Sequence, residues 1–148
     1  MAEFAIAAAI LQVAGAGFKL SWTLYEFGST VSSAQEHTDF IAQNVTLYSG
    51  VLKTLGQRLK DDEPVHSAEA LDLAEELQDS SEEIFEKIHE LLPKREKYSN
   101  SVSFMQRIAW VFKKSRVDFL VGQLDSLKAT VSLLVTILYA GRMIRSTQ

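Results

Sequence analysis

The amino-terminal segment constrains the fold most, because residues 4–18 (FAIAAAILQVAGAGF) contain one polar side chain, Gln12. A signal peptide would carry basic residues ahead of its apolar stretch, and Glu3 stands there instead. As a helix these residues reach about 22 Å, whereas a span crosses roughly 30 Å of hydrocarbon. The segment therefore predicts either a buried core helix or a helix that is docked in protein and can enter lipid.

Lengthening this helix to Phe27 would place Lys19 and Glu26 inside the bilayer, at about 2.5–3.5 kcal/mol each, which disfavours a permanent span. Docked, the helix is expected to bury Phe4, Ile10, Leu11 and Phe18. Small residues spaced by multiples of four predict close helix packing: Ala5, Ala9, Gly17 and Ser21. The residues predicted to enter a membrane are the large apolar ones: Phe4, Ile6, Ile10, Leu11, Val13, Phe18 and Leu20.

Four further segments have apolar residues at helical spacing, and they cover residues 33–60, 67–92, 102–112 and 116–141. Pro64 and Pro93 interrupt the pattern, and Ser67 and Ser115 are predicted helix caps. The sequence therefore predicts an all-α bundle of about five helices. Residues 131–141 (VSLLVTILYAG) are apolar almost all round, so the last helix is expected at the centre, with the first helix leaving an apolar surface at the edge.

The 148 residues correspond to one domain, predicted over residues 1–142 with a tail at 143–148. Charge is unevenly distributed, because residues 61–97 carry thirteen acidic and four basic side chains, whereas residues 98–148 carry two and seven. The net charge of −4 argues against nucleic acid as a partner. The basic cluster of Lys113, Lys114 and Arg116 either contacts anionic lipid, at about 1 kcal/mol per charge, or pairs with the acidic third helix.

No catalytic or cofactor motif is complete in this chain. The absence of cysteine excludes disulfides, thiolate catalysis and cysteine-bound zinc. Glu86 and His89 have the spacing of a di-iron ligand pair, but the second helical pair is missing. Gly15 and Gly17 begin a dinucleotide-type motif that Leu20 interrupts. We therefore expect neither enzymatic activity nor a bound metal or cofactor.

Residues 107–138 resemble the end of the amino-terminal domain of fungal STAND (NLR-like) proteins, which belongs to the HeLo-like group. The resemblance depends on Trp110, Phe112, Lys113 and Lys114, followed by Leu120, Leu124, Leu127, Lys128 and Leu133. The opening MAEFAIAAAILQVAGAGFKL also looks like this family. The group is similar in plan to the four-helix bundles of other cell-death proteins, and the resemblance spans about residues 1–142.

The resemblance implies a cell-death execution domain that is cytoplasmic and moves to the plasma membrane on activation. A nucleotide-binding receptor domain, in cis or in trans, would cluster the copies into a homo-oligomer. The released segment Phe4–Leu20 would then permeabilise the membrane, and Lys113, Lys114 and Arg116 would contact anionic lipid. The nucleotide-binding domain of the family is not present in these 148 residues. The alternative is a homotypic or adaptor protein-interaction module without membrane activity.

Overall fold

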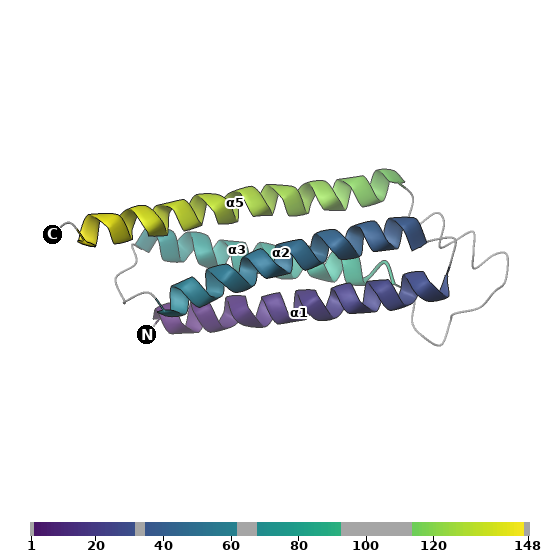
Figure 1. The fold of residues 1–148 in the computed structure, drawn as a ribbon, viewed down its shortest axis with the longest axis horizontal. Coiled ribbons are helices and arrows are strands. Elements are labelled where there is room, and N and C mark those ends of the chain that lie inside the picture. Colours follow the sequence, from purple (N-terminus) through teal and green to yellow (C-terminus); the bar gives the residue numbers. More distant parts are fainter. Residues whose placement is uncertain (1, 32–34, 62–67, 93–113, 147–148) are drawn as a thin grey trace.

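A computed structural model describes residues 2–31, 35–61, 68–92 and 114–146, and these residues form four helices. The helices are α1 (Ala2–Thr30), α2 (Gln35–Asp61), α3 (Ala68–His89) and α5 (Lys114–Ser146). Figure 1 shows them side by side, with successive helices running in opposite directions. Both α1 and α5 pack against α2 and α3, so α1 and α5 occupy opposite corners of the bundle.

The helices pack through buried residues that alternate spacings of three and four. This pattern averages 3.5 residues, the repeat that keeps one seam of a helix facing its neighbours. In α2 the seam comprises Thr38, Ile41, Val45, Tyr48, Leu52, Leu55 and Leu59. In α3 it comprises Ala70, Ala74, Leu77, Ser81, Ile84 and Ile88. In α5 it comprises Val117, Leu120, Leu124, the half-buried Leu127, Val131, Leu134 and Leu138.

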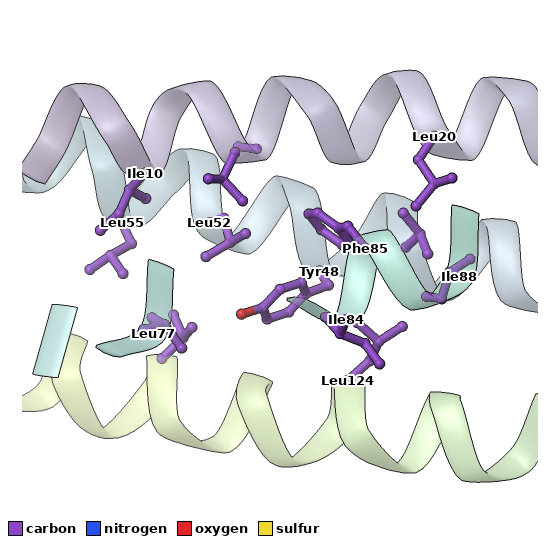
Figure 2. Packing of buried hydrophobic residues seen from close by; sticks show 14 of the residues in the cluster. Ile10, Leu20, Tyr48, Leu52, Leu55, Leu77, Ile84, Phe85, Ile88 and Leu124 are labelled. Atoms are coloured by element: carbon purple, nitrogen blue, oxygen red, sulfur yellow. The ribbon is translucent and has the colours of Figure 1, made fainter. Parts of the chain in front are cut away.

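The core lies along the axis between the four helices, as Figure 2 shows for its middle layers. Tyr48 of α2 points into this core, and its ring meets Phe85 of α3 edge to face, with the ring centroids 5.9 Å apart. Fully buried aliphatic residues, one from each of the four helices, complete these layers: Ile10, Leu52, Leu77 and Leu124. Such burial contributes roughly 1.5–3 kcal/mol per large side chain.

The all-α class is confirmed, whereas the described residues contain four helices rather than five. The expected helix at residues 102–112 lies outside the described residues, as does the predicted cap Ser67. The helix expected at residues 116–141 already begins at Lys114, so Ser115 lies within its first turn rather than at its cap. The division into a domain of residues 1–142 and a tail of residues 143–148 stays a prediction.

The expectation that the last helix lies at the centre of the bundle is wrong. Only 28% of the apolar 18-residue stretch of α5 is buried. The reason is that each helix in a ring of four turns only one of its faces toward the core. Its other faces expose large apolar side chains: Phe119, Leu133, Ile137 and Tyr139. The apolar composition of α5 therefore does not mean that other helices surround it.

Candidate functional site

The candidate site is α1, whose predicted membrane-inserting residues divide between two faces. Ile10, Val13 and Leu20 are buried in the core, and Ile6 and Leu11 are half-buried. Phe4 and Phe18 are exposed, which contradicts the expectation that docking buries them. The reason is that α1 packs against α2 and α3 on one side only. As a result, only 39% of the apolar 18-residue stretch of α1 is buried. The expectation that the first helix leaves an apolar surface at the edge of the bundle is therefore met.

The outer face of α1 carries an aromatic cluster made of Phe18, Trp22 and Tyr25. These residues are separated by four and three positions, which places them on one stripe of the helix. Trp22 is the most exposed, at 67% of its surface. The sequence-based site omitted Trp22 and Tyr25, although their spacing from Phe18 was a readable signal. Trp and Tyr are enriched where membrane-bound helices meet the headgroup layer.

The inner face of α1 meets α2 along a seam of small residues, which we call the α1–α2 seam. In α1 it consists of Ala7, Ala14, Ser21 and Gly28, and in α2 of Ala42, Ser49 and Gly56. Both series repeat every seven residues, so the two backbones approach closely over several turns. The contact between α1 and α2 is accordingly the most extensive in the described part of the chain.

The small-residue stripe predicted from spacings of four is correct in only half of its members. Gly17 and Ser21 are buried, whereas Ala9 is half-buried and Ala5 is exposed. Multiples of four drift around a helix with 3.6 residues per turn, whereas a helix in a bundle keeps a repeat of seven on one side. The stripe therefore leaves the seam toward the amino terminus.

Two glycines mark the closest approaches of α1 to its neighbours. A Cβ atom at Gly17 would lie 2.0 Å from Ser49 Oγ and 2.8 Å from the Phe85 ring. A Cβ atom at Gly56 of α2 would lie 2.8 Å from the side chain of Leu11. At both positions a side chain would force the helices apart, so glycine sets the separation.

Hydroxyl groups add polar contacts to the α1–α2 seam. Ser21 Oγ donates to the carbonyl oxygen of Ala42 at 2.8 Å and also contacts Thr46 Oγ1. Ser49 Oγ is buried and has no hydrogen-bond partner among the described residues. A buried hydroxyl without a partner costs roughly 1–3 kcal/mol, so the seam contains one locally unfavourable group.

A second buried polar group joins α2 to α3. Ser81 Oγ donates to the carbonyl oxygen of Leu77 at 2.6 Å, so the hydroxyl of Tyr48, 2.5 Å away, donates to Ser81. Burial raises the pKa of Tyr48 to about 12, because desolvation disfavours the phenolate. Tyr48 is therefore neutral and structural, because no exposed surface gives its oxygen access to a reactant.

The predicted lipid-contacting cations are placed only in part. Lys113 and the side chain of Lys114 lie outside the described residues, and Arg116 is exposed in the first turn of α5.

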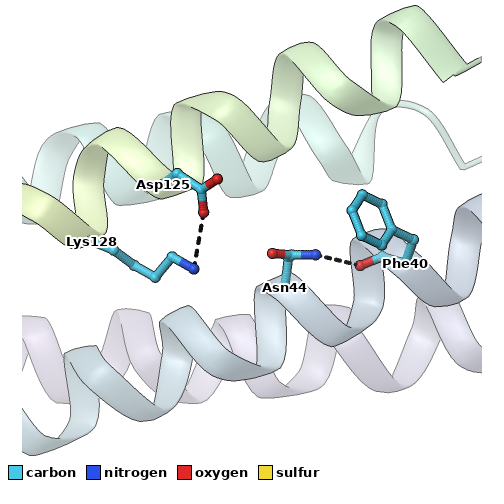
Figure 3. A network of polar contacts seen from close by, with 4 residues as sticks. All are labelled: Phe40, Asn44, Asp125 and Lys128. Carbon is cyan, nitrogen blue, oxygen red and sulfur yellow. Dashed lines mark hydrogen bonds and ion pairs between the residues drawn. The ribbon is translucent and has the colours of Figure 1, made fainter.

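Figure 3 shows polar contacts on the α2–α5 side, and each lies within one helix: Lys128 with Asp125 at 3.0 Å, and Asn44 Nδ2 donating to the carbonyl oxygen of Phe40 at 2.9 Å.

The acidic residues that the structure describes form no metal centre. Within the described residues, no group of three or more histidine, aspartate or glutamate side chains is arranged to hold a metal ion. Glu86 and His89 are exposed on α3, where they border a groove between α1 and α3.

Fold and site together define an antiparallel four-helix bundle with an apolar helix at a corner. Within the described residues, Phe4–Thr30 and Ser115–Ala140 are long and apolar enough to cross a membrane, although buried core helices can have this composition too. Comparison with protein-family models, curated proteins and solved structures found no match.

Proposed function

We propose that this chain is a membrane-targeting domain of the cell-death execution type, in which clustering releases α1 from the bundle into a bilayer. The observation that carries the proposal is that α1 is apolar on both faces. Its inner face fills the core, and its outer face exposes Phe4, Phe18 and Trp22 to solvent. Exposed aromatic residues that lie together on one helix face form the kind of apolar patch that marks a membrane or partner surface.

The α1–α2 seam is compatible with this proposal, because small-residue packing does not depend on the hydrophobic effect. Helices associate in lipid through the same close approach of glycine, alanine and serine. A released α1 would therefore retain a surface suited to packing against α1 of another copy. In lipid, the hydroxyl of Ser21 could bond to a carbonyl of its own helix.

Clustering has a defined energetic role in this mechanism. Release removes Ile10, Leu24 and Phe27 from the core, at roughly 1.5–3 kcal/mol each, and lipid restores that apolar contact. Lipid does not cover the faces of α2 and α3 that α1 leaves. Neighbouring copies would cover those faces, so release becomes favourable only in an assembly, where several insertions also act together.

The remaining parts of the proposal follow from the family resemblance. The domain would be cytoplasmic, and a nucleotide-binding receptor domain in cis or in trans would assemble it at the plasma membrane. Anionic lipid would attract Lys113, Lys114 and Arg116, at about 1 kcal/mol per charge. The domain would act without catalysis, cofactor or nucleic acid.

The test is a reversible staple between α1 and α2. Ser21 Oγ and Thr46 Oγ1 are in contact, so the double variant Ser21→Cys/Thr46→Cys places two thiols at bonding distance in a chain without other cysteines. Dye leakage from anionic vesicles is measured for the oxidised and the reduced variant. We expect leakage about tenfold or more slower in the oxidised form, because a disulfide blocks release. The reduced form is the matched control.

Two outcomes would contradict the proposal. Equal leakage from oxidised and reduced protein would show that α1 need not separate from α2 at position 21, which rejects release of the whole helix. Stable oligomers that neither bind nor permeabilise anionic vesicles would instead support the homotypic or adaptor interaction module. Light scattering together with vesicle flotation separates these outcomes.

A further inference from the structure

A groove of about 530 Å³ runs between α1 and α3. Its buried lining residues are Val13 and Leu20 from α1 and Phe85 from α3, and they form an apolar floor. Ala16, which is exposed, leaves the middle of the groove open. The volume lies in the range of sites that bind ligands or side chains of a partner.

One wall of this groove is lined by negative charge. Glu82, Glu86 and Glu90 follow one another at intervals of four, and the backbone bond from Glu90 N to the Glu86 carbonyl oxygen, 2.9 Å, continues the helical path. The carboxylates therefore recur about every 6 Å along the groove. Like charges at this spacing weaken a helix, so a partner that neutralises them gains energy.

On the neighbouring face of α3, a glutamate has an ion-pair partner. Glu83 pairs with Lys87 at 3.2 Å, whereas Glu82, Glu86 and Glu90 form no ion pair with another described residue. The described lining of the groove contains no lysine or arginine. Three carboxylates without an ion pair to a described residue therefore border the apolar floor.

We propose that the α1–α3 groove binds a cationic amphipathic helix of a partner protein. Such a helix carries lysine or arginine at every fourth position, which matches the spacing of the three glutamates. The apolar residues beside those cations then fit the floor formed by Val13, Leu20 and Phe85, a helix-in-groove mode of recognition. An anionic bilayer is a poor occupant, because the glutamates repel its headgroups.

Occupancy of the groove has a consequence for α1. Because α1 forms one wall, the partner binds only while α1 is docked, and by linkage it stabilises the docked state. This consequence rests on the proposed function, whereas binding itself does not. Binding is therefore measured in solution without lipid, so its failure is distinguishable from a failure of membrane release.

The probe is a fluorescent synthetic helix of about four turns, with lysine at every fourth position and leucine beside it. The reference peptide has the same composition, with lysines scattered around all faces. The variant Glu82→Gln/Glu86→Gln/Glu90→Gln is compared with Glu69→Gln/Glu75→Gln/Glu76→Gln, which removes equal charge from exposed positions of the same helix outside the groove. We expect the groove variant to raise the Kd about tenfold and the control less than about twofold.

A second pair of variants tests the groove itself. Ala16→Trp fills it from an exposed position, whereas Gly15→Trp adds the same ring where no atom lies within 4 Å of the new Cβ. We expect only Ala16→Trp to weaken binding, by about tenfold. Equal effects within either pair of variants, equal binding of the reference peptide, or no binding at about 1 mM peptide would overturn the proposal.

Discussion

Helices α1 and α5 both contain a long apolar stretch, but they are held in the bundle differently. Both are apolar enough to cross a membrane, and both pack against α2 and α3 from opposite corners. Helix α1 packs through a seam in which small residues such as Ala14 and Ser21 bring its backbone close to α2. Helix α5 packs through large residues such as Leu124 and Leu134.

The two helices thus illustrate two kinds of contact: close approach of two backbones, and burial of large apolar side chains. A small-residue seam gives close contact and little apolar area per residue, whereas leucine contacts bury more area. Close packing without large side chains is the kind of contact that survives transfer into lipid. Helix α1 thus combines a small-residue seam, which could form again in lipid, with large core residues such as Ile10 and Phe27, whose burial release would remove.

The largest expected effect tests the position of α5 at a corner. Leu134 is fully buried and its neighbour Leu133 is 56% exposed. We expect Leu134→Ala to lower the free energy of unfolding by about 2–5 kcal/mol, because it leaves a cavity in the core. Leu133→Ala should change it by less than about 0.5 kcal/mol. Urea unfolding measures both, and similar losses would place α5 at the centre after all.

Titration of Tyr48 tests how far water is excluded from the core to which both α1 and α5 contribute. Its pKa is raised to about 12 in the folded state, so between pH 10 and pH 12 the unfolded chain has lost more protons than the folded one. Stability falls as pH rises through that window, by roughly 2–3 kcal/mol from this group. Tyr48→Phe should lack this part of the loss. Identical alkaline profiles for both proteins would mean that Tyr48 is not desolvated.

A substitution at Gly17 sharpens the contrast between the two helices. Gly17→Val drives a side chain into Ser49 and Phe85, whereas Gly122→Val on α5 meets no atom within 4 Å. We expect the first to destabilise the fold by about 1–3 kcal/mol and the second to be near neutral. Thermal unfolding monitored by circular dichroism gives the two values. A neutral Gly17→Val would show that the α1–α2 seam is loose.

The smallest effect concerns the hydroxyl of Ser49 in the α1–α2 seam. Ser49→Ala removes a buried group without a partner and should stabilise the protein by about 1 kcal/mol. The matched control is Ser81→Ala, because the Ser81 hydroxyl is hydrogen-bonded to Tyr48 and Leu77 and its loss should destabilise. If release of α1 limits leakage, Ser49→Ala should also slow leakage. Destabilisation by Ser49→Ala would indicate that its hydroxyl has a partner.

Local patterns in the sequence were sufficient for the helical class and for most of the described helices. The apolar spacing in residues 33–60 predicted α2 to within two residues at each end, because an amphipathic stripe reports one buried face. The same reasoning did not divide Ile10 from Phe18, because a helix that is apolar on every side gives no sign of which side is covered. Likewise, spacing by fours identified Gly17 and Ser21 as interface residues and misplaced Ala5.

What the sequence determined by itself was the presence of two helices apolar on nearly all sides, since composition and periodicity are properties of a single segment. Only the tertiary structure decided that neither is enclosed, that Ala7, Ala14, Ser21 and Gly28 face α2, and that three glutamates of α3 border an apolar floor. These features depend on how many neighbours surround each helix and at what distance. Neighbour number and distance arise from packing of the whole bundle, which no single segment encodes.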